Sequence, residues 1–302
     1  MGGTRSAWED CADDYAREVA ESPWGQALYS EVASRVKRLL KGRGPGATIL
    51  DVAAAVGEPA LTVAACLPAA KIIATDASQA MVQAMRSRVR AWGLPNVVCK
   101  IADGEMLVGF KDGTVDVVTC AHGVEYMPSA ERAVAEFWRV ARRGGWVVVV
   151  TWAPPRGCSM FAFQEKAHHL QEAAEAAAEG WPPPRGGEVP GRAPDHLGRE
   201  GVLMGLLEGA GFVEVQEQRG SVTHRLGKPP AAVFRDEFEV PFATKIARWE
   251  AAGSGHVVQQ CYGHFLRTLQ EMGAVGEGGD VEFTDNEYVM CWGRKPPRKG
   301  SV

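Results

Sequence analysis

The 302-residue sequence predicts an α/β protein built on a doubly wound parallel sheet. Five apolar runs lack the polar alternation of half-exposed strands, which is typical of strands buried on both faces. Amphipathic stretches of helical length separate these runs, so a helix is expected between successive strands. The five runs are TILDVA (48–53), KIIATD (71–76), VVCKIA (97–102), VDVVTCA (115–121) and WVVVVTW (146–152).

Helices are expected before and between these strands. Two come before the sheet, and in the second of them Leu28, Val32 and Val36 recur at helical spacing. Ser78 and Ser129 stand directly before two later helices, where an N-cap residue is expected. The expected helices cover residues 7–20, 25–42, 57–67, 78–93 and 129–145.

The pattern changes after the fifth strand. An alanine- and glutamate-rich stretch at 158–180 predicts a helix, and a Pro/Gly-rich connector at 181–198 cannot be helical. A helix at 199–212 then leads into a sixth strand, and a helical region at 230–272 precedes a last strand. We therefore expect an N-terminal helical cap (1–45), a core (46–153 and 199–295), a lid or substrate-binding insertion (154–198 with parts of 228–275) and a flexible tail (296–302).

The composition argues against several classes of protein. A formal charge of −4 gives no reason to expect a nucleic-acid partner. The seven cysteines are scattered, odd in number and never in a C-x-x-C pair, which favours reduced thiols and argues against a metal site. No apolar run is long enough to cross a bilayer, and the start lacks the pattern of a signal peptide. A cytoplasmic protein is expected.

The N-terminus adds a second option for localisation. MGGTRS fits the pattern for N-myristoylation, with Gly2 exposed after removal of Met and Ser6 in place. A chance match in a polar start is the alternative. A single acyl chain would anchor the protein to a membrane only marginally.

The stretch ILDVAAAVGEPALTVAA (49–65) predicts a ligand site, because ligands of doubly wound sheets bind at the carboxyl ends of the strands. An acid at the end of the second strand can bind ribose hydroxyls, and Asp76 stands about 20 residues after the loop. Its alternative role is that of an acid at a helix N-terminus. A second acidic loop contains Asp103 and Glu105, which suit an adenine amino group or an ordinary solvated turn. The G-x-G-x-x-G pattern of dinucleotide binders is absent.

Taken together, ILDVAAAVGEPALTVA, IIATDASQAMV, IADGEML, VDVVTCAHGVEYM and RRGGWVVVVTW resemble the class I S-adenosylmethionine-dependent methyltransferases. The resemblance is to the small-molecule branch that includes the ubiquinone/menaquinone-type enzymes. It covers about residues 48–152 and extends weakly through GLLEGAGFVEVQ and the last strand. It implies a Rossmann-like seven-stranded sheet, S-adenosyl-L-methionine as cofactor, S-adenosyl-L-homocysteine as product and a small-molecule methyl acceptor.

The resemblance also implies which residues contact the cofactor. Tyr15, or Trp8, in the first helix would close over the cofactor, and packing of the aromatic ring on the core is the alternative. Asp51 would orient the loop and meet the methionine amino group. The other implied contacts are Ala53, Ala55 and Gly57 at the methionine end, Asp76, Ala77 and Met81 around ribose and adenine, Asp103 and Gly104 at the adenine amino edge, and Ala121 near the sulfonium.

The loop departs from the G-x-G-x-G pattern of the family. Ala53 and Ala55 replace two glycines, and only Gly57 is kept. A methyl group at Ala53 is harmless if the residue has a negative φ. At Ala55, a left-handed conformation would cost about 1–2 kcal/mol and weaken binding by about tenfold to thirtyfold. Val56 replaces a common threonine and removes a hydroxyl contact.

Two functions stay open on this basis. One is a methyltransferase with an altered loop, and the other is a catalytically silent fold that acts as a binding or interaction module. An NAD-type oxidoreductase is a third option. Methyl transfer from a sulfonium depends mainly on positioning and desolvation. An acidic phenol or enol carbon would also need a base.

His122, in CAHGVEYM, is the candidate base. Its alternatives are a hydrogen bond within the loop or a contact with the cofactor only. Glu125 and Tyr126 are weaker candidates in the same loop. An aromatic or lipid-like acceptor pocket, or simply the core of the lid, is expected from Met160, Phe161, Phe163 and Trp181.

Overall fold

The structure is a computed structural model. It describes residues 12–16, 20, 22–43, 46–154, 157–160, 162–163, 169, 172–173, 176, 195–239 and 243–297. Several predictions fall outside the described residues: those on Gly2, Ser6, Trp8, Phe161 and Trp181, and most of the expected tail.

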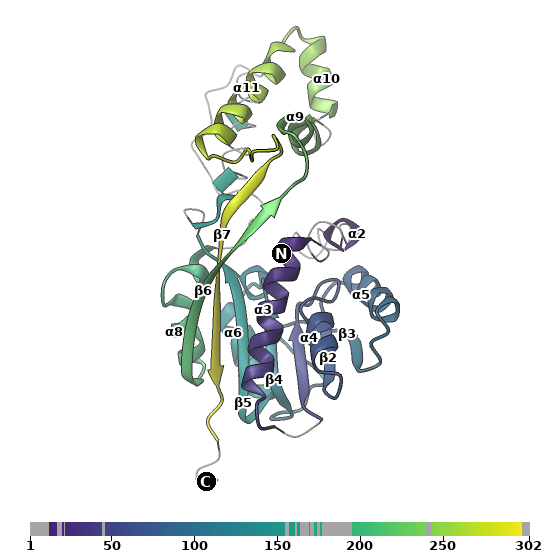
Figure 1. Cartoon of the computed structure of the whole chain (residues 1–302), viewed down its shortest axis with the longest axis vertical. Helices are drawn as coiled ribbons and strands as arrows, with labels where there is room; N and C mark the ends of the chain where they lie inside the picture. The colour runs from purple at the N-terminus through teal and green to yellow at the C-terminus, as the bar shows by residue number, and fades with distance from the viewer. Residues whose placement is uncertain are drawn as a thin grey trace. The chain divides into compact units, whose positions relative to one another are not determined.

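Seven strands form one sheet in the order β3-β2-β1-β4-β5-β7-β6 (Figure 1). The strands are β1 (Thr48–Val52), β2 (Lys71–Asp76), β3 (Val97–Ile101), β4 (Val115–Ala121), β5 (Ala141–Trp152), β6 (Val213–Arg225) and β7 (Glu282–Arg294). The strands β1 to β5 pair in parallel, and β7 pairs with β5 in the antiparallel sense. The predicted seven-stranded doubly wound fold is therefore confirmed, with an antiparallel strand on one side of the parallel part.

A helix separates β1 from β2, β2 from β3 and β4 from β5, as predicted, whereas β3 and β4 are joined by turns. The described helices are α2 (Ala12–Tyr15), α3 (Pro23–Leu39), α4 (Ala60–Cys66), α5 (Gln79–Ala91), η2 (Val124–Tyr126), α6 (Ala130–Val140), η4 (Asp195–Gly198), α8 (Val202–Gly209), α9 (Pro230–Phe234), η5 (Arg235–Glu239), α10 (Ala243–Ala251) and α11 (His256–Glu271). Both predicted N-caps are confirmed: the hydroxyl of Ser78 accepts from the Met81 amide at 3.1 Å, and that of Ser129 from the Arg132 amide at 3.2 Å.

The fifth strand begins earlier than its apolar run. The helix α6 ends at Val140, and β5 begins at Ala141, whereas a helical end through 145 was predicted. Ala141 pairs with Val115, and the register shifts before Val117 pairs with Trp146. A Cβ on Gly145 would lie 2.9 Å from the Asp116 carbonyl oxygen, so the absence of a side chain permits this close passage. Backbone pairing therefore overrides the local helical pattern.

One hydrophobic core cluster lies between the sheet and helices α6 and α8. It joins fully buried residues of β4 and β5 to one face of each helix. Phe137 of α6 and Leu203 and Leu207 of α8 have no exposed surface. In α3, the predicted apolar face is confirmed, because Leu28, Val32 and Val36 are at most 1% exposed. This packing holds the carboxyl ends of the parallel strands in place.

The chain divides into two compact units. The first contains residues 1–154, 193–220 and 288–302, and the second contains residues 155–192 and 221–287. The second unit thus includes more of the C-terminal region than the expected parts of 228–275. Its core is aromatic: Phe163 meets Phe265 edge-on at 5.3 Å, and Met160 packs against the same cluster. Of the two interpretations of these residues, this packing favours a core of the insertion itself.

Two further features concern the environment of the protein. Within the part of the chain that the structure describes, no helix has both the length and the apolar character that a membrane span requires. The described cysteines are all free thiols: Cys66, Cys99, Cys120, Cys158, Cys261 and Cys291.

Candidate cofactor and catalytic site

Asp51 lies at the centre of the predicted site, on β1, and has no exposed surface. Its Oδ1 accepts a hydrogen bond from the Thr119 hydroxyl at 2.6 Å, and its Oδ2 accepts one from the Ala60 amide at 3.0 Å. The carboxyl group therefore ties β1 to β4 and to the first residue of α4. This arrangement orients the loop between β1 and α4. Contact with a methionine amino group stays a prediction.

Burial raises the pKa of Asp51 to about 7. The two hydrogen bonds act in the opposite direction, because they stabilise the ionised form, but desolvation is the larger effect. Nearby Glu58 and Asp76 raise the pKa further by repulsion. Asp51 therefore changes charge near neutral pH.

The loop after β1 contains two alanines in the left-handed region. Ala53 has a φ of 57° and Ala55 a φ of 47°, and Gly57 follows with 118°. The harmless case, a negative φ at Ala53, is therefore wrong. The turn is held by hydrogen bonds from the Ala54 amide to the Thr75 carbonyl (2.8 Å) and from the Gly57 amide to the Ala54 carbonyl (2.7 Å). Each alanine is expected to cost about 1–2 kcal/mol.

We expect Ala55→Gly to raise the free energy of unfolding by about 1 kcal/mol, because glycine adopts a positive φ without strain. Chemical denaturation of the purified protein measures this. Ala54→Gly is the matched control, since Ala54 is not among the residues with positive φ and its replacement only adds flexibility. Equal destabilisation by both substitutions would contradict the assignment of strain to Ala55.

Asp76, at the end of β2, connects the loop to α5. Its Oδ2 accepts from the Ala55 amide and its Oδ1 from the Ser78 amide, both at 2.9 Å. The hydrogen bond from the Ser78 amide places Asp76 at the N-terminus of α5. This is the alternative role that the sequence allowed for Asp76. The side chain is partly exposed, as is that of the neighbouring Ala77. Contact with ribose hydroxyls stays a prediction.

The expected adenine side is covered by the N-terminal segment. Met81 is 1% exposed and belongs to a core cluster with Val56, Ala12 and Ala20. Tyr15 of α2 packs against the same cluster. Tyr15 therefore lies beside the loop and α5 and contributes to packing, which was its alternative role, and closure over a cofactor stays a prediction.

The loop after β3 is built as a turn. Asp103 is exposed, and its Oδ1 accepts from the Glu105 amide at 2.9 Å. Glu105 pairs with Arg132 of α6 at 2.7 Å, so its carboxylate links this loop to a helix. A Cβ on Gly104 would lie 2.9 Å from a methyl carbon of Val52, which brings the loop against the end of β1.

His122 directly follows β4 and has a φ of 54°. Its amide donates to the Val150 carbonyl at 2.9 Å, and its ring stacks on Trp152 at 4.2 Å with an interplanar angle of 18°. A Cβ on Gly123 would lie 2.5 Å from the Cβ of Ala53. The structure thus brings the candidate base close to the strained loop after β1. Ala121, the last residue of β4, is partly exposed.

Two aromatic residues near the site were missed. Trp152 forms the stacking surface for His122, and the aromatic end of WVVVVTW was the available signal. Tyr29 of α3 is buried, and burial raises its pKa, with Tyr15, Glu58 and Asp51 adding to the effect. The sequence offers no local signal for Tyr29, because its position on α3 is simply that of a core residue.

Several buried polar atoms at this edge have no partner within the described residues. The amide of Val56, a residue with no exposed surface, donates no hydrogen bond there. Both ring nitrogens of His122 are also buried without a hydrogen bond. Buried polar groups are normally satisfied, so these atoms suit a polar ligand at the carboxyl ends of β1 and β4.

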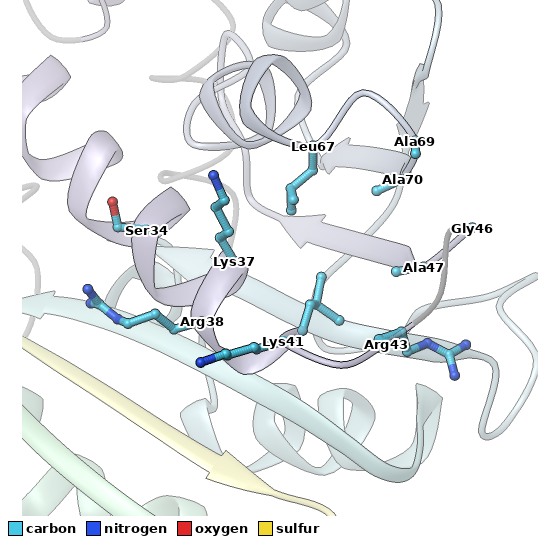
Figure 2. A pocket seen from close by; sticks show the side chains of 11 residues that line it. Ser34, Lys37, Arg38, Lys41, Arg43, Gly46, Ala47, Leu67, Ala69 and Ala70 are labelled. Carbon is cyan, nitrogen blue, oxygen red and sulfur yellow. The ribbon is translucent and has the colours of Figure 1, made fainter.

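A cavity of about 630 Å³ lies at the amino ends of the parallel strands, next to the residues that precede β1 and β2 (Figure 2). Figure 2 shows Lys37, Arg38, Lys41 and Arg43 around it. Lys37 and Arg38 stand in the last turn of α3, where cations offset the negative end of the helix, and Arg43 pairs with Asp116 at 2.7 Å. Lys37, Arg38 and Arg43 thus have structural roles, and none of the predicted site residues lines this cavity.

Residues 50–149 match a protein family described as a methyltransferase domain. The chain is similar to this family over these residues, which make up about a third of its length. A ubiquinone/menaquinone biosynthesis C-methyltransferase of Burkholderia mallei is 36% identical over 117 residues, which make up 36% of this chain and 46% of that protein. The chain thus spans about half the length of the curated relatives that it matches. The predicted resemblance to this branch of methyltransferases is confirmed.

Solved structures agree on the fold of the chain. The YcgJ protein of Bacillus subtilis has a TM-score of 0.55 at 15% identity, covering 88% of this chain and 99% of its own. The [4+2]-cyclase SpnF has a TM-score of 0.53 at 22% identity, covering 92% and 85%. The second name describes a cyclase, so this fold alone does not determine the reaction.

Proposed function

We propose that the protein is an S-adenosylmethionine-dependent methyltransferase that acts on a small molecule. The observation that carries this proposal is the match of residues 50–149 to a methyltransferase domain. Within this region, the strained loop and the segment of His122 lie next to each other at the carboxyl ends of the parallel strands. When bound, S-adenosylmethionine would supply a methyl group carried on a positively charged sulfur. After transfer of the methyl group, that sulfur is part of a neutral thioether, S-adenosylhomocysteine.

The residues of this edge support binding of such a nucleoside. Asp76 would bind the ribose hydroxyls, and the loop from Ala53 to Gly57 would meet the amino-acid end. The buried amide of Val56 is suited to donate to the carboxylate of that end, since it has no acceptor within the described residues. Tyr15 would cover the nucleoside from the N-terminal side.

His122 is proposed as the base that removes a proton from the acceptor. Its side chain is 9% exposed, so a proton transfer there takes place away from bulk water. The stacked Trp152 ring covers one face of the imidazole and holds its plane. Because the matched relatives are named C-methyltransferases of ubiquinone and menaquinone biosynthesis, an aromatic quinol carbon is the first acceptor to test.

Titration calorimetry with S-adenosylhomocysteine tests the proposed cofactor. We expect saturable binding, and a thermal-shift experiment is expected to show stabilisation by S-adenosylhomocysteine and none by NAD. Asp76→Asn is expected to weaken binding by about tenfold or more, because a charged acceptor of two hydroxyl groups is lost. Absence of heat at millimolar S-adenosylhomocysteine would favour the catalytically silent alternative.

A further inference from the structure

Glu125 is a buried carboxylate of η2 that faces His122. It is 2% exposed, and its Oε1 lies 3.4 Å from Nδ1 of His122, which is within ion-pair distance but longer than a hydrogen bond, so neither atom has a hydrogen-bond partner within the described residues. The other oxygen, Oε2, accepts from the Thr151 hydroxyl and from the Trp152 amide, the latter at 3.2 Å. One side of the carboxylate is thus held by β5, and the other side is turned to the imidazole.

We propose that Glu125 is a positioning residue that holds His122 in the tautomer with the proton on Nδ1. This inference rests on the proposed function, in which His122 accepts a proton. With Nδ1–H directed at Glu125 Oε1, Nε2 carries the lone pair. That nitrogen is buried and has no hydrogen-bond partner within the described residues. The proton of the acceptor then goes to Nε2, while its carbon or oxygen takes the methyl group.

Three features make this arrangement specific. The backbone of His122 lies in the left-handed region, which sets the direction of its side chain. Stacking on Trp152 fixes the plane of the ring, so rotation about the bond to the ring is restricted. The Trp152 amide can only donate a hydrogen bond, so the atom of residue 125 that faces it must be an acceptor.

The last point predicts the effect of Glu125→Gln. The amide oxygen of the glutamine would stay with Thr151 and Trp152, which places its NH₂ group opposite Nδ1 of His122. An NH₂ group donates, so Nδ1 must become the acceptor and the proton moves to Nε2. A base with its outer nitrogen already protonated cannot accept a proton, and kcat is expected to fall by about 10²- to 10⁴-fold.

Two-dimensional ¹H–¹⁵N NMR of ¹⁵N-histidine-labelled protein at pH 8 reads the tautomer directly, and His122→Asn assigns the signal. We expect Nδ1–H in the wild type, Nε2–H in Glu125→Gln and no change in Glu131→Gln, whose carboxylate is exposed on α6. Nε2–H in the wild type, or the same tautomer in both proteins, would overturn the inference. Where Glu125→Gln does not fold, the wild-type spectrum decides alone.

Calorimetry with S-adenosylhomocysteine on the same samples separates this inference from the proposed function. Failure of the wild type to bind would remove the proposed function, whereas the tautomer would still be observed. Normal binding by Glu125→Gln with a reversed tautomer and reduced kcat supports the positioning role, because a merely structural role would leave the tautomer unchanged.

Discussion

Replacement of His122 by asparagine is expected to lower kcat by about 10²- to 10⁴-fold and to leave cofactor affinity within about twofold. In the proposed reaction the acceptor loses a proton to His122, and asparagine cannot take that proton. Asparagine is chosen because it tolerates the left-handed backbone that His122 adopts, so the loop is kept while the imidazole is removed. Methyl transfer from labelled S-adenosylmethionine to 1,4-naphthoquinol measures the rate.

The control is His256→Asn, at the exposed first residue of α11 in the second unit. Both variants carry the same chemical change, and only His122 lies beside the loop after β1. Full turnover by His122→Asn, with normal S-adenosylhomocysteine binding, would exclude His122 as the base. Reaction would then depend on positioning and desolvation by the surrounding residues.

The pH dependence of folding stability is expected to carry a contribution from Asp51. Its folded pKa of about 7 lies above the value of about 4 in an unfolded chain. Between these values the folded state holds a proton that the unfolded state has released, so stability falls as pH rises from about 4 to about 7. Between pH 5 and pH 8, the titration of Asp51 is expected to lower the free energy of unfolding by about 3 kcal/mol.

Asp51→Asn removes this titration. Urea denaturation at pH 5 and pH 8 is expected to show a loss of stability in the wild type that exceeds the loss in the variant by about 3 kcal/mol. Comparison of the two losses cancels the lower stability that the variant has at every pH from its weaker bonds to Thr119 and Ala60. Parallel pH profiles would mean that Asp51 is ionised throughout.

Much of the core could be predicted because its signals are local. The strands β1, β2 and β4 are largely buried, and this is visible in three short runs of sequence. The expectation of burial on both faces is wrong for β3, which lies at the edge of the sheet and leaves Val98 and Ile101 exposed. Ser78 and Ser129 cap their helices through bonds to residues three positions away, so each cap was readable from its own neighbourhood. The start of β5 was predicted wrongly, because the pairing of Ala141 with Val115 depends on a distant strand.

The candidate site was predictable in its positions and not in its contacts. The sequence placed Asp51, Asp76 and His122 at strand ends, where a doubly wound sheet collects them. It did not indicate that Met81 would be buried against the N-terminal segment. It also did not indicate that Glu125 would turn one oxygen to His122, since this depends on Thr151 and Trp152 across the sheet.

By itself, the sequence determined the class of fold and the order of strands and helices, because these follow from periodicity and chain order. The edge at which a ligand binds stays a prediction from the same pattern. Only the tertiary structure decided the conformation of Ala53 and Ala55 and the environment of His122. A backbone angle at a tight turn is set by hydrogen bonds to β2, and the surroundings of an imidazole are set by the strand beside it. Both are contacts between residues far apart in the chain.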